Sequence, residues 1–477
     1  MSGSEKCKAD LMGDLSENLH RLLGEKGWRR PPDCQRWQRD WLDQSGEEPL
    51  GVALPSSSYE VAQVLKLCQS AKVPIVRQGG NTSLAGGAVL HKPDGVILSM
   101  SRMNAVSEPD IESGTIEIES GAILADLHQG LKGKGLMFPM HLGSEGSAQI
   151  GGLIATNAGG SHAFRYGMMQ DLVLGLEVVL ADGSIWNGMR SVQKDNAGYQ
   201  LRKLFCGSEG TLGVITRASL RLHPEHVQQA TACIALRDFD SAVTFATRSR
   251  TEAGEFLMAL EFFSDFGLDM ALTHIPSLSF PLTQRSPYYL LVEAGSSSGQ
   301  VPLEGIINNV IEWGFEAGVV LDGVVATSLS QRAALWRLRE GQPEGQRLEG
   351  PQLKHDISVP PGRLAGFLKR AEKICGSILP GIRINPFGHL GDGNVHFNLS
   401  PPRGMNDFSG QEEEFALQLG SLAAEMGGSF AAEHGLGRTK VWLADILRDP
   451  AERKLMRSIK QALDQAEILN SGTLVQV

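Results

Sequence analysis

The spacing of hydrophobic and polar positions in residues 51–77 predicts a strand, a helix and a second strand. The apolar run 51–55 is typical of a strand. Ser57, followed three residues later by Glu60, forms a capping box that starts an apolar-periodic helix reaching about Lys72. Residues 73–77 then predict the second strand.

Later segments carry further strand and helix patterns. Residues 172–186 predict a β-hairpin around a central turn. From about Pro224, longer helical patterns alternate with strands, as at 256–262 and 288–292, which indicates a second, α+β domain. Residues 449–469 have helical periodicity, with charged residues on the expected outer face.

Two histidines seven residues apart, His389 and His396, flank a glycine-rich turn. Residues 391–394 predict a tight turn, so Leu390 is expected to pair with Val395 and His389 to lie opposite His396. Cross-strand Cβ atoms are about 5 Å apart, which lets both rings reach one divalent ion at about 2.1 Å. The hairpin therefore predicts half of a metal site.

Glu433 is the natural third ligand, because a catalytic ion usually takes three protein ligands and keeps one position open. His434 beside it is then available for proton transfer. The alternative is that His389 and His396 are ordinary surface or capped histidines, as a lone histidine usually is. The joint pattern favours the metal site.

Three glycine-rich segments offer closely approachable backbone. Residues 78–87, 143–160 and 205–216 combine glycines with small and hydroxyl residues, as anion-binding loops require. A flexible turn is the alternative for any one segment taken alone. None of them is a G-x-G-x-x-G motif opening a βαβ unit or a P-loop, so a Rossmann dinucleotide fold is disfavoured.

Length and composition bound the function classes. The chain has 477 residues and 42% hydrophobic residues, which predicts two or three domains. A net charge of −10 without a long Lys/Arg run argues against nucleic acid as a partner. No apolar run is long enough to span a bilayer, so an integral membrane protein is not expected, and residues 1–20 resemble neither a signal nor a transit peptide.

Six scattered cysteines without a C-x-x-C pair fit a reducing compartment and argue against disulfides and an ordinary iron–sulfur site. A cytoplasmic location is expected, with peripheral association to a membrane electron-transfer chain left open. If the protein is a redox enzyme, its electrons must leave through another molecule.

Five ordered motifs together resemble one family. They are the loop 77–87, the G-G-x-x-A-T-N-A-G-G segment 151–160, the G-S-E-G-T-L-G segment 207–213, the hairpin 389–396 and the Glu433–His434–Gly435 triplet. They look like the FAD-dependent D-2-hydroxyacid dehydrogenases of the vanillyl-alcohol-oxidase flavoprotein superfamily, from about Pro55 to about Gly472. Residues 335–340 and 429–435 are most similar to the branch acting on D-2-hydroxyglutarate, and the D-lactate dehydrogenases are the nearer rival.

This resemblance implies an α+β fold with a two-subdomain PCMH-type FAD-binding domain. The expected parts are an N-terminal helical segment over 1–48, the FAD-binding domain over 49–223, an α+β (ferredoxin-like) substrate and metal-binding domain over 224–440, and a C-terminal helical segment over 441–477 that returns to the FAD domain.

The resemblance also implies which residues bind FAD. No histidine lies between Arg77 and Gly87, where some relatives attach the flavin covalently, so non-covalent FAD is expected. The implied cofactor-binding residues are Arg77, Gly79, Gly80, Asn81, Thr82, Ser83, Gly87, Gly143, Gly146, Gly151, Gly152, Thr156, Asn157, Gly160, Glu209, Gly213, Ile215 and Asn470.

By the same resemblance, His389, His396 and Glu433 ligate a divalent ion, zinc first, with manganese, cobalt and iron as alternatives. The ion acidifies the substrate hydroxyl, His434 removes its proton, and hydride passes to flavin N5.

The substrate-binding residues that the resemblance implies are Arg339, Lys354 and Asn398. A surface ion pair for Arg339 and a solvated position for Lys354 are the alternatives from residue type alone. The chain departs from the family at Pro343, where relatives carry a hydroxyl residue, so one substrate contact is expected to be missing. Asn470-Ser471-Gly472 and Asp464-Gln465 also lack the family's usual prolines, which predicts a less rigid C-terminal turn.

The expected reaction is oxidation of a D-2-hydroxy acid, D-2-hydroxyglutarate or D-malate, to the 2-keto acid. The expected partner is an external electron acceptor, a quinone, an electron-transfer flavoprotein or a cytochrome, and a homodimer is left open. The alternatives are a D-lactate or glycolate dehydrogenase, a non-redox flavoprotein synthase of the same superfamily, and a flavin-binding module without catalysis.

Overall fold

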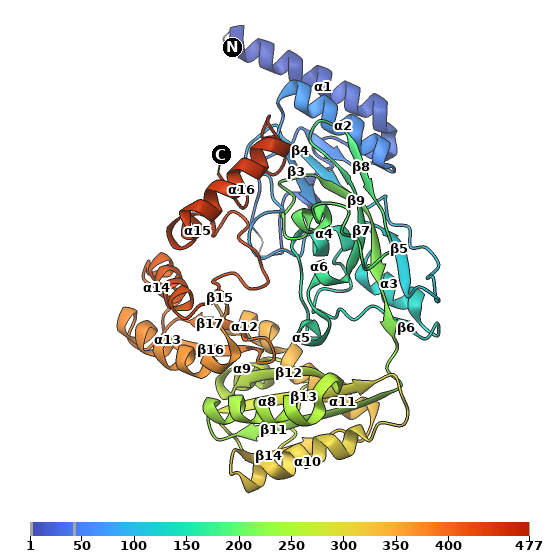
Figure 1. The fold of residues 1–477 in the computed structure, drawn as a ribbon. Coiled ribbons are helices and arrows are strands. Elements are labelled where there is room, and N and C mark those ends of the chain that lie inside the picture. Colours follow the sequence, from blue (N-terminus) through green and yellow to red (C-terminus); the bar gives the residue numbers. More distant parts are fainter. Residues whose placement is uncertain (1–2, 42–43, 477) are drawn as a thin grey trace. The chain divides into compact units, whose positions relative to one another are not determined.

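The computed structural model describes residues 3–41 and 44–476 and contains two compact units (Figure 1). The first unit comprises Met1–Gly160, Gly167–Pro224 and Glu433–Val477, and the second comprises Ser161–Tyr166 and Glu225–Ala432. The domain bounds expected from the sequence stay a prediction, and residues 1–2 and 42–43 of the expected segment 1–48 lie outside the described residues.

The first unit begins with a small sheet in the order β1-β2-β4-β3, in which β2, β4 and β3 are parallel. Its elements are α1 (Gly3–Gly27), β1 (Trp28–Arg29), η1 (Gln35–Trp37), β2 (Gly51–Ala53), α2 (Ser58–Ala71), β3 (Ile75–Gln78) and β4 (Val96–Ser99). The predicted strand–helix–strand unit is confirmed, and the Ser57 hydroxyl accepts the Glu60 amide at 3.2 Å.

A second, antiparallel sheet has the order β5-β9-β7-β8, and its β7–β8 pair is the hairpin predicted over 172–186. The elements of this part are β5 (Thr115–Glu119), α3 (Leu124–Leu131), β6 (Leu136–Met137), α4 (Ile150–Ala155), α6 (Met169–Leu172), β7 (Val173–Val179), β8 (Ile185–Gly188), α7 (Leu201–Phe205), β9 (Val214–Arg221) and β10 (His223–Pro224).

The C-terminal helices α15 (Val441–Leu447) and α16 (Pro450–Leu463) also belong to the first unit. The helix predicted over 449–469 ends early, because the Asp464 carboxylate accepts the Ile468 and Leu469 amides and turns the chain. The expected charged outer face is wrong for Arg453 and Lys460, which are 2% and 3% exposed.

The second unit is built on one antiparallel sheet. Strands β14-β11-β13-β12 have the 4-1-3-2 order of a ferredoxin-like fold, and β16-β17-β15 extend this sheet beyond β12. The strands are β11 (Gln228–Leu236), β12 (Leu257–Ser264), β13 (Tyr288–Ser296), β14 (Val320–Val325), β15 (Leu353–Ser358), β16 (Arg383–His389) and β17 (Asn394–Ser400). The expected α+β substrate domain is confirmed in its fold class.

Helices cover both faces of this sheet. One face packs in a large apolar core against α8 (Phe239–Ala253), α10 (Leu303–Glu316), α13 (Leu364–Ile378) and α14 (Glu412–Glu425). The other face carries α9 (Asp265–His274), α11 (Leu329–Glu340) and α12 (Gln342–Glu349). The short elements α5 (Ala163–Tyr166), η2 (Gly254–Phe256) and η3 (Pro361–Arg363) complete the unit.

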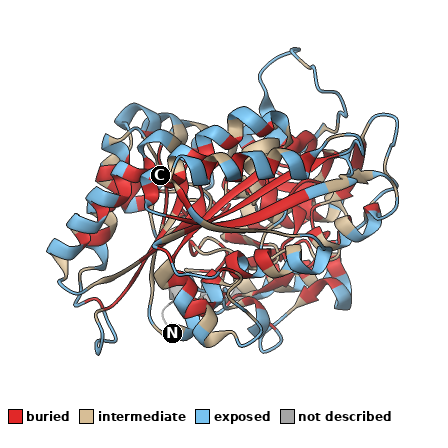
Figure 2. Cartoon of the chain, turned by 90° about the horizontal axis from the view of Figure 1, so that it is seen from below, coloured by how far each residue is buried: buried red, intermediate tan, exposed pale blue. Residues whose placement is uncertain are grey.

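Figure 2 shows the buried positions concentrated along strands and on one side of each long helix, as amphipathic packing requires. Within the described residues, no helix combines the length and the apolar character needed to cross a membrane.

Candidate active site

The β16–β17 hairpin has a register two residues away from the predicted one. His389 pairs with Asn394 and Phe387 pairs with His396, so the expected pairing of His389 with His396 is wrong. The loop consists of residues 390–393 because the Gly393 amide donates to the His389 carbonyl at 3.0 Å, with Gly393 at a φ of +84°. A two-residue shift keeps each side chain on its face, so the rings still meet, with centroids 5.6 Å apart.

Strand alternation places a set of polar side chains on the same face as these histidines. Lys354 is opposite Asn398 and Asp356 is opposite His396 across the β15–β17 ladder, and Asn385 is opposite Asn398 on β16. The intervening residues Val395, Phe397 and Leu399 point into the apolar core on the other face. The sheet thus has one apolar face and one polar face over β12-β16-β17-β15.

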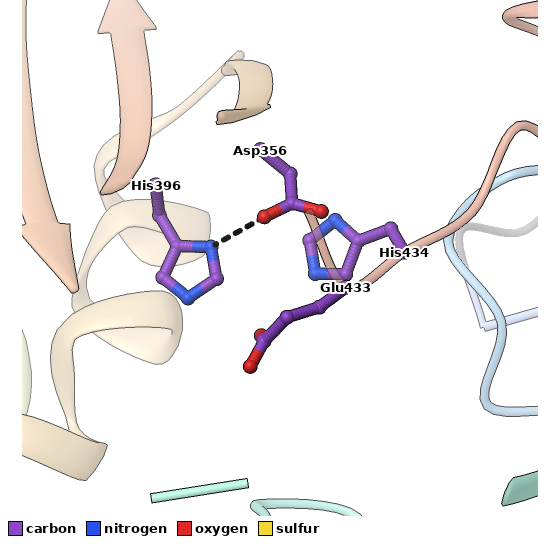
Figure 3. Close-up of side chains that lie close together, drawn as sticks. All are labelled: Asp356, His396, Glu433 and His434. Atoms are coloured by element: carbon purple, nitrogen blue, oxygen red, sulfur yellow. Dashed lines mark ion pairs between the residues drawn. The ribbon is translucent and has the colours of Figure 1, made fainter. Parts of the chain in front are cut away.

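Each hairpin histidine has a buried carboxylate at its Nδ1 atom. His389 Nδ1 lies 2.7 Å from Glu261 Oε1. His396 Nδ1 lies 3.7 Å from Asp356 Oδ1, the ion pair drawn in Figure 3. Asp356 is held in turn by the Asn394 side-chain amide at 2.9 Å. A carboxylate at Nδ1 favours a proton on that nitrogen, which makes Nε2 the electron-pair donor, as in histidines that ligate metals.

Glu261 also connects His389 to the expected substrate arginine. Its second oxygen lies 2.9 Å from Arg339 Nε as an ion pair, and the Arg339 guanidinium lies over the Phe387 ring at 4.9 Å. Burial raises the pKa of Glu261, but the charges of His389 and Arg339 outweigh burial and hold the pKa below its usual value. Arg339 is therefore a buried residue of the polar face and not part of a surface ion pair.

The segment 429–434 is attached to the edge strand β15. Ser429 forms a bridge with Ser358, and the Ala432 amide donates to the Asp356 carbonyl at 3.3 Å. Glu433 and His434 follow Ala432 directly, and potential ligand atoms of Asp356, His396, Glu433 and His434 all lie within 4.8 Å of one another (Figure 3).

Asp356 was not anticipated from the sequence as part of this group. The available signal was its spacing of two residues from Lys354 on an alternating strand. His389 is not among the four residues, so the ligand set His389, His396 and Glu433 stays a prediction. The first unit has a second such group, formed by His128, His141 and Glu145, whose potential ligand atoms also lie within 4.8 Å of one another.

The remaining expected substrate residues lie along the polar face. Burial lowers the pKa of Lys354, and no acidic side chain within residues 3–41 and 44–476 forms an ion pair with its ammonium. The Asn398 side-chain amide donates to Gln346 Oε1 of α12 at 2.7 Å. Pro343 is exposed on α12, and the missing contact expected there stays a prediction.

The first unit holds the glycine-rich loops in contact with one another. A pocket there is lined by several expected FAD-binding residues, Arg77, Gly79, Gly151, Gly152 and Ile215 among them. A Cβ atom at Gly80 would lie 1.9 Å from the Ser147 carbonyl oxygen, so only glycine permits this close approach of two loops. The glycines in the pocket wall leave the backbone open to close approach by a ligand.

Four expected cofactor residues adopt the left-handed conformation. Asn81, Asn157, Glu209 and Asn470 have φ values of 57°, 49°, 45° and 47°. Such conformations cluster at binding sites because the surrounding structure must enforce them. The four left-handed residues let the loop backbone turn in directions that extended or helical residues do not allow.

Hydrogen bonds join these loops across long sequence distances. The Glu209 carboxylate accepts the Leu436 and Gly437 amides, both at 2.8 Å, and burial raises its pKa to about 7. The Asn470 side-chain amide donates to the Gly87 and Glu209 carbonyls at 3.1 and 2.8 Å. The Arg77 guanidinium donates to the Gly213 carbonyl, and burial lowers its pKa to about 9.

Arg77, Glu209 and Asn470 thus hold the loops together. Contact of these and the other expected residues with FAD stays a prediction.

Comparison with known proteins matches the chain to two domain families. Residues 49–188 match the FAD binding domain family, and residues 225–474 match the C-terminal domain of FAD linked oxidases. The solved structure of p-cresol methylhydroxylase is 17% identical, with a TM-score of 0.76 over 97% of this chain and 96% of that one. The solved structure of an alkyldihydroxyacetonephosphate synthase is also 17% identical, with a TM-score of 0.71 over 96% of this chain and 84% of that one. These likenesses establish the PCMH-type fold.

Curated relatives match over nearly the whole chain. The mitochondrial D-2-hydroxyglutarate dehydrogenase of Arabidopsis thaliana is 35% identical, covering 94% of this chain and 79% of its own. The enzyme of Rattus norvegicus is 36% identical, covering 92% of this chain and 81% of its own. The enzyme of Xanthomonas citri pv. viticola is 34% identical, covering 94% of this chain and 93% of its own.

The fold and the matched domains define a FAD-dependent oxidoreductase. The chain belongs to the FAD-linked oxidase family that includes these dehydrogenases.

Proposed function

We propose that this enzyme oxidises a D-2-hydroxy acid to the 2-oxo acid, with D-2-hydroxyglutarate as first candidate and D-malate as second. The observation that carries the proposal is the polar face of the second unit's sheet. It combines His389 and His396, each beside a buried carboxylate, with Lys354, which has no acidic partner among the described residues. The names of the relatives support the choice of D-2-hydroxyglutarate.

The donor set fits a divalent metal. Two imidazole Nε2 atoms from His389 and His396 with the Glu433 carboxylate suit zinc, and also manganese, cobalt or iron. Such an ion supplies a Lewis acid that lowers the pKa of a bound hydroxyl. The carboxylates of Glu261 and Asp356 fix the orientation of the two rings from behind.

The protein's own groups handle the proton and the carboxylates. His434 accepts the proton of the C2 hydroxyl, and the C2–H electron pair leaves as hydride while the C2–O double bond forms. Arg339, Lys354 and Asn398 bind the carboxylates and orient C2. When bound, FAD accepts the hydride, and we infer that it is held without a covalent bond because Asn81 stands where a histidine would attach it.

Electrons then pass to an external acceptor, which is a quinone, an electron-transfer flavoprotein or a cytochrome. A non-redox synthase remains the second candidate, and a likeness in fold is its support. The paired histidines with their carboxylates favour the dehydrogenase.

Anaerobic addition of D-hydroxy acids to the purified yellow protein tests the proposal. D-2-hydroxyglutarate or D-malate is expected to bleach the flavin absorbance, and the L enantiomers are not. The variant His434→Ala is expected to slow bleaching by about 10²–10⁴-fold, the contribution of a general base. Failure of every D-hydroxy acid to bleach the wild type would exclude the dehydrogenase.

A further inference from the structure

The inner side of α12 presents carboxamides to the polar face of the sheet. Gln342 and Gln346, one helical turn apart, are both 0% exposed, and Gly345 between them packs against α9. Pro343, where the family's hydroxyl residue is missing, lies on the exposed side of the same helix. The polar contacts that α12 makes with the sheet come from Gln346, which accepts the Asn398 amide, and from Glu349, which forms an ion pair with Arg383 of β16.

Gln346 has only half of its hydrogen-bonding capacity used. Its Oε1 atom accepts the Asn398 amide at 2.7 Å, whereas its Nε2 atom is buried and finds no hydrogen-bond acceptor in the described part of the chain. A buried N–H donor without an acceptor costs roughly 1–3 kcal/mol and calls for an explanation such as a ligand.

Lys354 brings a positive charge to the same place. It lies directly opposite Asn398 in the β15–β17 ladder, and cross-strand neighbours have Cβ atoms about 5 Å apart. Burial is the cause that lowers the pKa of Lys354, since no acid compensates for it. Asn398 thus lies between a half-buried ammonium and a buried amide donor, the combination that binds a carboxylate.

We propose that Gln346 and Lys354 bind the carboxylate at the far end of a dicarboxylic 2-hydroxy acid, and that Gln346 also positions Asn398. The inference rests on the proposed function. It makes Gln346 a specificity-determining residue. The chemistry favours a dicarboxylate over a monocarboxylate such as D-lactate.

The variant Gln346→Met tests this inference, because methionine has similar volume and no amide. The quantity to measure is the selectivity for D-2-hydroxyglutarate or D-malate over D-lactate, given by the ratio of the anaerobic flavin-reduction efficiencies. We expect this selectivity to fall about tenfold to one-hundredfold, because that is the usual contribution of a hydrogen bond to a charged group. The dissociation constant of glutarate, followed by the change in flavin absorbance, is expected to rise by a similar factor.

Gln342→Met is the matched control. Gln342 is equally buried on the same side of α12, but its amide donates to the Leu338 carbonyl at 3.0 Å. Its replacement is expected to leave the selectivity and the glutarate affinity unchanged. Wild-type selectivity in Gln346→Met, or an equal change in both variants, would overturn the inference.

If Gln346→Met does not retain FAD, Lys354→Met supplies the same test. Its selectivity for dicarboxylates is expected to fall at least as far, and unchanged selectivity would overturn the inference. A wild type that no hydroxy acid bleaches would refute the proposed function instead. The glutarate affinities of wild type and variants would then still decide whether Gln346 and Lys354 bind a carboxylate.

Discussion

At the scale of single residues, two buried carboxylates determine what the hairpin histidines can do. Glu261 and Asp356 face the Nδ1 atoms of His389 and His396, and Glu261 also forms an ion pair with Arg339. One glutamate therefore connects an expected metal ligand to an expected substrate residue. Its loss is predicted to affect metal affinity and substrate binding together.

Glu261→Gln is expected to lower metal affinity about 10- to 100-fold, because the amide keeps the shape of the side chain and removes its charge behind His389. Metal retained after equilibration with graded chelator, measured by elemental analysis, gives the affinity. Both proteins should carry His141→Ala, so that the group of His128, His141 and Glu145 does not contribute.

Glu293→Gln is the matched control for Glu261→Gln. Glu293 is also a fully buried glutamate of this sheet, but its partners are Arg332, Trp336, Thr231 and His162. Its replacement is expected to leave metal affinity unchanged. Equal losses in the two variants would mean that the effect comes from general destabilisation of the sheet.

Glu209 predicts a pH dependence of stability. Its pKa in the fold is about 7, against an ordinary value of 4.5, because burial disfavours the charge. Between these pH values the unfolded chain has released the proton and the folded chain has kept it. Stability of the FAD-free protein therefore falls as pH rises through this window, by about 3 kcal/mol in total.

The comparison of wild type with Glu209→Gln isolates this contribution, since glutamine does not titrate. The difference in apparent unfolding free energy between the two proteins, from urea denaturation, is expected to change between pH 4.5 and 7 and to be constant above. A constant difference across the whole range would contradict a raised pKa for Glu209.

Residues within contiguous motifs could be predicted from the sequence, and their distant partners could not. His389, His396 and Glu433 were identifiable because turn chemistry and short spacing place them. Glu261 and Gln346 lie more than forty residues from the hairpin, and nothing in their own residue type distinguishes them from structural acids and amides. Their roles depend on strand pairing and helix packing, which one sequence does not reveal.

At the scale of elements, the existence of strands and helices was predictable, but register and helix ends were not. The hairpin loop length decided the register, and the four-residue loop 390–393 was set by a single amide-to-carbonyl bond. The charged stripe of α16 was expected on the outside, yet its Arg453 and Lys460 are buried. Periodicity alone cannot distinguish a solvated charge from one with buried partners.

Lys460 fixes α16 to the rest of the first unit. Its ammonium donates to the Asp464 carboxylate at 2.5 Å and to the Thr211 and Leu469 carbonyls at 2.9 and 2.7 Å. Lys460→Met leaves the Asp464 charge buried without its partner, and is expected to destabilise the unit by about 3–5 kcal/mol. Thermal unfolding should show a clear drop in the midpoint.

Lys454→Met provides the control, because Lys454 is exposed on the same helix. It is expected to change stability by less than about 0.5 kcal/mol. An equally small effect of Lys460→Met would show that the buried lysine does not stabilise the fold.

At the scale of the whole molecule, cofactor and substrate chemistry reside on different parts of the chain. The expected FAD residues, Glu433 and His434 belong to the first unit, whereas His389, His396 and the substrate residues belong to the second. The order of these parts was predictable from motif order and from the change of pattern near Pro224. Chelation is therefore predicted to remove the metal and leave the flavin bound.

Absorbance spectra after chelator treatment and desalting test this independence. The protein is expected to remain yellow, to lose reduction by D-2-hydroxyglutarate, and to regain it when zinc or manganese is added. Full activity of the metal-free protein would contradict the proposed role of His389, His396 and Glu433.

The most direct test of the proposed oxidation is an anaerobic titration of the enzyme with D-2-hydroxyglutarate, in which flavin reduction and product are measured together. We predict one equivalent of 2-oxoglutarate for each flavin reduced, and no reduction by the L enantiomer. Flavin that stays oxidised, or that is reduced without formation of the 2-oxo acid, would contradict the proposed reaction.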